Sequence, residues 1–270
     1  MNVSWNKFKK IAFDGIAEGG SFIYRGQSDA TWTLKSSIFR TDIVSTPPDI
    51  IGYVNYILPQ IQEPVEAWSD RTWNLSDYHG LAEFIAFLQH NGFPTPLLDF
   101  TVSPYIAAYF AFEGVDHFSP KSKEVSIYRF NRTLWAEKFP DKTDIADTSE
   151  KVSVIMPYVR GNHKMSQQQG LFLYSNISDI DAYIRSHEEF HGQYLCKYVI
   201  DVFERPVVIK ELSLMGVSAV QLNPSIESVC KKALEDIIGL IPMKKREENQ
   251  PPEKLNEVER DEATDVQERV

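Results

Sequence analysis

The spacing of apolar residues along the chain predicts several amphipathic helices. In the first of them, Trp5, Phe8 and Ile11 recur at helical spacing, and Gly19-Gly20 ends the helix. A proline at 104 suits the first turn of a later helix. Patterns of this kind predict helices over residues 2–18, 49–70, 75–89, 105–112, 206–215 and 226–239.

Short runs rich in β-branched and aromatic residues predict strands between the helices. They lie at 22–24, 125–130, 152–158, 170–174, 194–202 and 219–222, and a short strand with a turn is expected within 30–40. Because helices and strands alternate irregularly, the order does not fit a βαβ repeat. We expect an α+β fold with a mixed, mainly antiparallel sheet flanked by helices.

The 270 residues predict one domain over 1–243, with a helical insertion at about 49–90. From Lys244 onward the residues are mostly Glu, Lys, Arg, Gln and Pro, without apolar periodicity. We therefore expect 244–270 to be a charged, disordered tail.

The formal net charge of −10 argues against binding of nucleic acid over a broad basic surface, although a local basic cleft is compatible with it. No apolar stretch reaches the length of a membrane span, and the N-terminus lacks the apolar region of a secretory signal, so we expect a cytoplasmic protein without a membrane partner. Cys196 and Cys230 form no CxxC pair, and His187 and His191 lie in a short polar stretch. We expect no metal site.

The segment Tyr24-Arg25-Gly26-Gln27 follows the first predicted strand directly. A guanidinium group binds phosphate or carboxylate with two parallel hydrogen bonds, and a glycine lets a ligand approach the backbone. This pattern predicts an anion-binding site. The alternative is that Arg25 pairs with a structural carboxylate such as Asp99.

A second polar segment runs from His90 to Ser103, between two predicted helices. His90 is a candidate base or ligand for a ribose hydroxyl, and its structural alternative is to cap the preceding helix or to bind Asp99. Asp99, Thr101 and Ser103 have a structural alternative as capping groups of the following helix.

These motifs resemble those of the bacterial FRG-domain family. The family's Phe/Tyr-Arg-Gly motif is matched by Tyr24-Arg25-Gly26, its second block by residues 89–111, and a Gln-Gln-Gly block by 168–172. A fourth match covers residues 212–224, so that the resemblance extends over about 20–240. Pro96 stands where the family usually has arginine, and Asn223-Pro224-Ser225 replaces a more usual Phe-Pro-Asp.

The resemblance implies a role in bacterial conflict, as a toxin or anti-phage defence effector with an antitoxin or defence-system partner. A more distant similarity links Tyr24-Arg25-Gly26, Thr101-Val102-Ser103 and residues 107–111 to ADP-ribosyltransferases. That similarity implies an ADP-ribosyltransferase-like fold and NAD as co-substrate for modifying a macromolecular acceptor, protein or nucleic acid.

Under this interpretation Arg25 holds the NAD diphosphate or ribose, and Tyr109 or Phe110 stacks on nicotinamide. No glutamate occupies the late strand 194–202, where these transferases carry theirs, and Glu204 and Glu227 are the late alternatives. The expected catalytic residues are His90, Asp99 and Gln168, and the expected ligand-binding residues are Tyr24, Arg25, Gly26, Gln27, Thr101, Ser103, Tyr109 and Gln169.

Two other hypotheses follow from the same residues. The missing glutamate favours a non-catalytic module that senses a nucleotide or a phosphorylated ligand. Nuclease action on RNA is disfavoured by the acidic composition. Both site hypotheses require Arg25, His90, Asp99, Thr101 and Gln168 to converge on one cleft.

Overall fold

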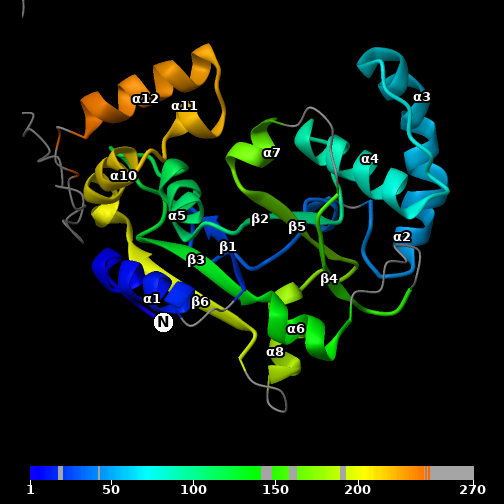
Figure 1. Cartoon of the computed structure of the whole chain (residues 1–270), viewed down its shortest axis with the longest axis horizontal. Helices are drawn as coiled ribbons and strands as arrows, with labels where there is room; N and C mark the ends of the chain where they lie inside the picture. Colours follow the sequence, from blue (N-terminus) through cyan, green and yellow to red (C-terminus); the bar gives the residue numbers. More distant parts are fainter. Residues whose placement is uncertain are drawn as a thin grey trace, which may run out of the picture.

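A six-stranded antiparallel sheet forms the centre of the computed structural model (Figure 1). The structure describes residues 1–17, 21–41, 43–140, 148–157, 163–188, 193–239, 241 and 243. The strands lie in the order β4-β5-β2-β1-β3-β6. Their bounds are β1 Phe22–Gln27, β2 Leu97–Thr101, β3 Glu124–Asn131, β4 Val152–Ile155, β5 Gly170–Ser175 and β6 Leu195–Asp201.

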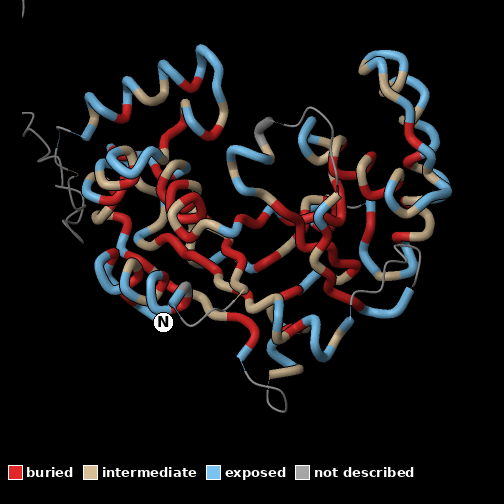
Figure 2. Tube along the Cα trace, in the orientation of Figure 1, coloured by how far each residue is buried: buried red, intermediate tan, exposed pale blue. Residues whose placement is uncertain are grey.

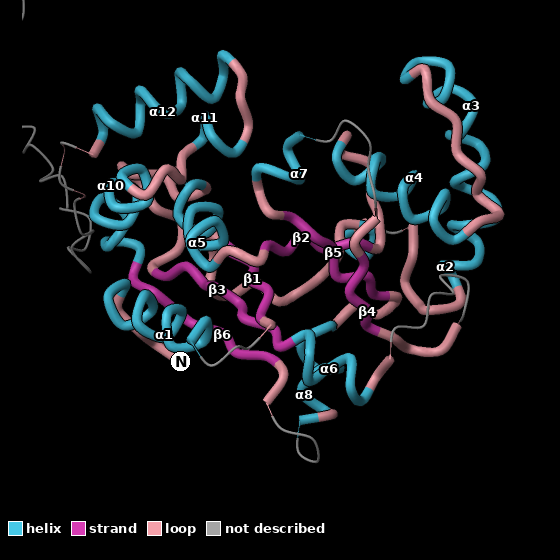
Figure 3. Tube along the Cα trace, in the orientation of Figure 1, coloured by secondary structure: helices cyan, strands magenta, loops and turns pink. Residues whose placement is uncertain are grey.

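One face of the sheet carries two separate groups of helices. The helices α1 (Trp5–Ala17), α5 (Pro104–Glu113) and α10 (Arg205–Leu214) share a buried apolar cluster with β1, β3 and β6. The helices α2 (Asp49–Gly52), α3 (Leu58–Ser69) and α4 (Tyr78–His90) pack as a second group against β2, β4 and β5. Figure 3 shows the two groups on either side of the short helix α7 (His163–Gln167), above the middle of the sheet.

The opposite face is covered by α6 (Arg132–Lys138) and α8 (Ile180–Ser186). Neighbouring residues of a strand point to opposite faces, so Tyr24 joins the helical cluster of α5 while Ile23 packs beside Trp135 of α6. Both faces of the sheet therefore carry buried residues, and Figure 2 shows many of the buried residues along the strands.

Strands β1 and β2 pair at only one register position, Tyr24 with Thr101. On its other side, β1 pairs with β3 along its whole length from Phe22 to Gln27. The two central strands consequently diverge beyond Tyr24, and this divergence leaves Arg25 and Gly26 at an opening in the sheet.

The expected α+β class, the antiparallel sheet and the flanking helices are confirmed. Helices predicted at 2–18, 75–89, 105–112, 206–215 and 226–239 correspond to α1, α4, α5, α10 and α12 (Ile226–Ile238). The expected helix 49–70 is interrupted by a π-helical turn at Tyr53–Ile57. Residue 158 of one predicted strand and the tail 244–270 lie outside the described residues.

Two predicted strands are wrong. Residues 219–222 form the short helix α11, because Ala219 and Leu222, three residues apart, are buried on one side. Residues 30–37 form an irregular loop that leads into a 3-10 turn at Ile38–Arg40. The short helices α6, α7 (His163–Gln167) and α8 were not predicted.

Candidate functional site

A cleft of about 370 Å³ lies above the diverging strands, on the helical face of the sheet. Its walls come from β1, β2, β5, α4, α5 and the segment 165–168 around the end of α7. The cleft brings together Arg25, His90, Asp99, Thr101 and Gln168, as both site hypotheses require. Tyr24, Gly26, Gln89, Phe110 and Phe172 also line it.

Arg25 lies at the base of the cleft, where β1 and β2 separate. Its Nη1 donates a hydrogen bond of 2.7 Å to the backbone oxygen of Asp99 and lies 3.9 Å from that residue's carboxylate Oδ2. Only 18% of the Arg25 side chain is exposed, and its buried Nε has no hydrogen-bond partner. Burial lowers the pKa of the guanidinium, and the Asp99 carboxylate opposes that shift.

The pairing of Arg25 with Asp99 leaves the carboxylate of Asp99 open to solvent, while the guanidinium stays largely buried. Asp99 occupies the one exposed position of β2, with 63% of its side chain exposed. The unpartnered Nε is a buried donor, which costs free energy until an acceptor binds it. The site therefore places the hydrogen-bonded guanidinium of Arg25 beside one accessible carboxylate, that of Asp99.

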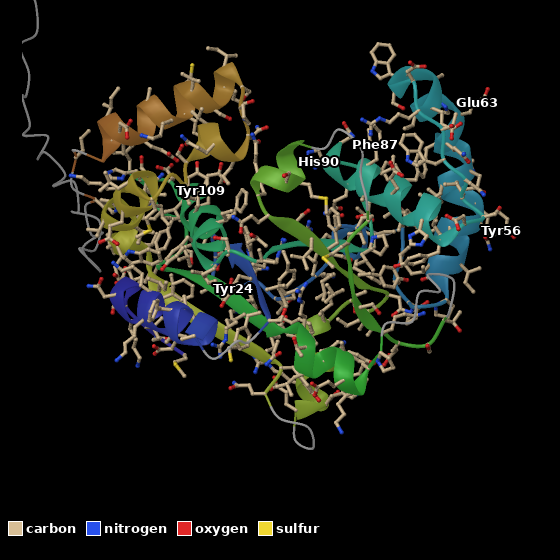
Figure 4. The ribbon with its side chains drawn as sticks, viewed as in Figure 1. Tyr24, Tyr56, Glu63, Phe87, His90 and Tyr109 are labelled. Atoms are coloured by element: carbon tan, nitrogen blue, oxygen red, sulfur yellow. The ribbon has the colours of Figure 1, made fainter. Side chains whose placement is uncertain are left out.

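Gln89 is a site residue that the sequence did not single out, although it begins the second family block. Its Nε2 donates to Asp99 Oδ2 at 3.1 Å and to the Leu97 oxygen at 3.4 Å, and its Oε1 accepts a hydrogen bond from Thr95 Oγ1. This side chain thereby holds the end of α4 against β2. His90, the last residue of α4, is exposed at the mouth of the cleft (Figure 4).

Thr101 and Gln168 join two walls of the cleft. Thr101 Oγ1 donates to the backbone oxygen of Gln168 at 2.8 Å, and Gln168 Nε2 donates to the Leu222 oxygen at 3.3 Å. Gln169 is exposed with a positive φ of 47°, and its oxygen accepts a hydrogen bond from Val102 N. Gln168 lines the cleft, whereas Gln169 shapes the turn into β5.

Gly26 has a packing role in addition to its place beside the cleft. A Cβ at this position would lie 2.6 Å from the backbone nitrogen of Ala111, and closer still to the backbone oxygen of Ala107. The glycine therefore allows α5 to approach β1. Tyr24 is buried against α5, and burial raises the pKa of its hydroxyl.

Besides Gln169, three more of the expected ligand-binding residues do not line the cleft. Gln27 is buried at the end of β1, where its Nε2 donates to the Thr33 oxygen at 3.1 Å. Ser103 is the N-cap of α5 and accepts a hydrogen bond from Ile106 N at 3.3 Å. Tyr109 is buried and donates to Glu235 Oε1 of α12, so that Phe110 is the aromatic residue of α5 that reaches the cleft.

Neither late glutamate reaches the cleft. Glu204 accepts a hydrogen bond of 2.9 Å from the backbone nitrogen of Trp5, and Glu227 is exposed on α12. Asp99 is the only carboxylate among the described residues that line the cleft.

Two features are absent from the described residues: a cluster of metal-ligating side chains and a helix suited to crossing a membrane. These residues contain no cluster of three or more His, Cys, Asp or Glu side chains placed to hold a metal ion. None of their helices combines the length and apolar character that crossing a membrane requires.

One region of the chain matches a known family model. Residues 20–119 match the family model of the FRG domain, a region that includes β1, α4, β2 and α5. No curated protein and no solved structure matches the chain, so the ADP-ribosyltransferase-like fold is not confirmed.

Proposed function

We propose that the cleft binds a nucleotide through Arg25, which lies in the region that matches the FRG domain, with NAD as the first ligand to test. The observation that carries this proposal is the buried guanidinium whose Nε has no partner. Nucleotides offer phosphate oxygens, which accept hydrogen bonds from guanidinium in a matching planar geometry. A phosphate at this point satisfies the buried donor.

The remaining walls of the cleft suit the other parts of a nucleotide. Phe110 and Phe172 provide apolar surface for a base, and Gln89 and Gln168 bring amide groups for a ribose or a base edge. The cleft volume of about 370 Å³ falls in the range of small-molecule sites. These features support binding of a whole nucleotide rather than of a bare anion.

Transfer of ADP-ribose is the second candidate function, and the exposed carboxylate of Asp99 favours it. In this reaction the bond from ribose C1′ to the nicotinamide nitrogen breaks, and its electron pair leaves with nicotinamide. An acceptor nucleophile then bonds to C1′ and gives its proton to His90. Asp99 stabilises the positive charge that develops on the ribose, which is the task of the glutamate in the transferases.

The binding proposal is tested by calorimetric titration of the protein with NAD and with ADP-ribose. Arg25→Gln should weaken binding at least tenfold, because a charge-assisted hydrogen bond is lost. Arg185→Gln is the matched control, since Arg185 is an exposed residue of α8 on the other face of the sheet. Equal NAD affinity in wild type and Arg25→Gln, with both folded by circular dichroism, would overturn the proposal.

The transferase candidate needs a separate readout. Nicotinamide release and label transfer from NAD to protein or nucleic-acid acceptors should occur in the wild type and fall strongly in Asp99→Asn. Asp14→Asn, an exposed change on α1, is the control. A toxin or anti-phage role depends on this activity, so growth arrest on induced expression should be lost in the same variant. Binding without release leaves the protein a nucleotide sensor.

A further inference from the structure

A second pocket, of about 700 Å³, lies beyond Arg25 at the end of β1. Its wall is the loop after β1, and its lining includes Lys35 and Arg40 together with Gln27, Trp32 and Phe110. Arg25, Gly26 and Phe110 border both this pocket and the cleft. We call it the basic pocket, defined by Arg25, Lys35 and Arg40.

The basic pocket is lined by positive charge, whereas the whole chain has a negative formal net charge. Three cations line it and no carboxylate does, although the protein has a formal net charge of −10. Within the described part of the chain, no ion pair joins Lys35 or Arg40 to a carboxylate. Burial lowers the pKa of Arg25, and the charge of Arg40 adds to that effect. An anion between these groups would relieve their mutual repulsion.

Two buried polar atoms at the pocket have no hydrogen-bond partner: Arg25 Nε and Gln27 Oε1. The first is a donor and the second an acceptor. Gln27 as a whole is only 7% exposed, so its free oxygen is costly to leave unsatisfied. A ligand that satisfies both atoms must offer an acceptor and a donor. A phosphate with an attached ribose does so, because its oxygens accept and its hydroxyls donate.

The loop that forms the wall is held in place without a ligand. The backbone oxygen of Trp32 accepts hydrogen bonds of 3.0 Å from Tyr128 Oη and from Lys197 Nζ. Leu34 N donates to Asp181 Oδ1 at 2.8 Å, and Arg40 Nη1 donates to the Lys35 oxygen at 3.1 Å. Trp32 nevertheless remains 54% exposed. The pocket thus combines three cationic side chains with an accessible aromatic ring, on which a base can stack.

We propose that the basic pocket is a second nucleotide-binding site, in which Arg25, Lys35 and Arg40 hold a phosphate and Trp32 stacks on the base. This site is distinct from the cleft, because Lys35 and Arg40 do not line the cleft, and Asp99 and His90 do not line the pocket. Arg25 borders both sites, and its single Nε–H can bind only one ligand at a time, whereas Gln27, Lys35 and Arg40 belong to the basic pocket alone.

The test is a calorimetric titration with ADP and, separately, with inorganic pyrophosphate. The double variant Lys35→Gln/Arg40→Gln should weaken ADP binding at this site at least tenfold, as expected when two charge-assisted hydrogen bonds are lost. Lys10→Gln/Arg185→Gln removes the same charges from exposed helix positions of α1 and α8 and should match the wild type. Trp32→Ala should weaken ADP binding but leave pyrophosphate binding unchanged.

A cleft variant separates this inference from the proposed function. His90→Ala/Gln168→Ala changes only cleft residues and should keep the ADP site that the basic-pocket variant loses. If Lys35→Gln/Arg40→Gln binds ADP with the affinity and stoichiometry of the wild type, the second site does not exist. If Trp32→Ala weakens ADP and pyrophosphate equally, or neither, the stacking role of Trp32 is refuted.

Discussion

Replacing Gly26 with alanine should destabilise the protein by forcing β1 and α5 apart. The added Cβ would meet backbone atoms of Ala107 and Ala111, which belong to a buried helix and cannot rotate away. Overpacking of a core costs about 1–3 kcal/mol, and a collision with backbone atoms of two residues of α5 places this substitution at the upper end, about 3 kcal/mol. For a domain of this size, that loss lowers the melting temperature by roughly 6–12 °C.

Thermal unfolding followed by circular dichroism measures the effect, and Gly52→Ala is the matched control. A Cβ at Gly52 has no neighbour within 4 Å, and the residue lies at the end of α2 in a continuous helical stretch. Alanine favours helix over glycine by up to about 1 kcal/mol, so this variant should melt at or above the wild-type temperature. If Gly26→Ala melts within about 2 °C of the wild type, the close approach of α5 to β1 is wrong.

Three further substitutions test the assignments around the cleft. Ser103→Ala should cost about 1 kcal/mol in a urea titration, because it removes the N-cap of α5, and should leave NAD affinity unchanged. Tyr109→Phe should cost about 1 kcal/mol by the same assay, since its hydroxyl donates to buried Glu235. Burial raises the pKa of the Glu235 carboxyl above its ordinary 4.5, and the charge of Arg205 opposes this shift. The protonated carboxyl therefore contributes fully to stability below pH 4.5, and this contribution is lost as the pH rises through the raised pKa. Glu235→Gln should therefore show a shallower fall of melting temperature with rising pH than the wild type, and parallel curves would contradict this assignment.

The long elements could be predicted from the sequence because the spacing of their apolar residues indicates which side of each element is buried. α1 and α4 have one buried face each, and β3 has a continuous buried run at its centre. Segments too short to show a period were missed or misassigned. Residues 219–222 form a single turn of helix. Val220 is typical of a strand, but the burial of Ala219 and Leu222 on one side decides the conformation.

The sequence motifs led us to expect five residues in one cleft, and the structure places Arg25, His90, Asp99, Thr101 and Gln168 there, but the motifs did not show which way α5 faces. This helix is apolar on nearly every side, with Ile106, Ala107, Tyr109 and Phe112 all buried. Adjacent residues of a helix point about 100° apart. Tyr109 and Phe110 therefore face different neighbours, and only the packing against α12 shows that Tyr109 turns away from the cleft.

The unequal pairing of β1 is the structural origin of both pockets. Full pairing with β3 fixes the strand, whereas the single pair Tyr24–Thr101 lets β2 diverge and leaves Arg25 without a neighbouring strand on that side. Its guanidinium bridges the opening by donating to the Asp99 oxygen, with the cleft on one side and the basic pocket on the other. Arg25 is consequently shared by two pockets whose other polar residues are separate. Unchanged nucleotide binding in Arg25→Gln would count against both pockets, whereas weaker binding is assigned to the cleft by the paired variant of His90 with Gln168 and to the basic pocket by the paired variant of Lys35 with Arg40.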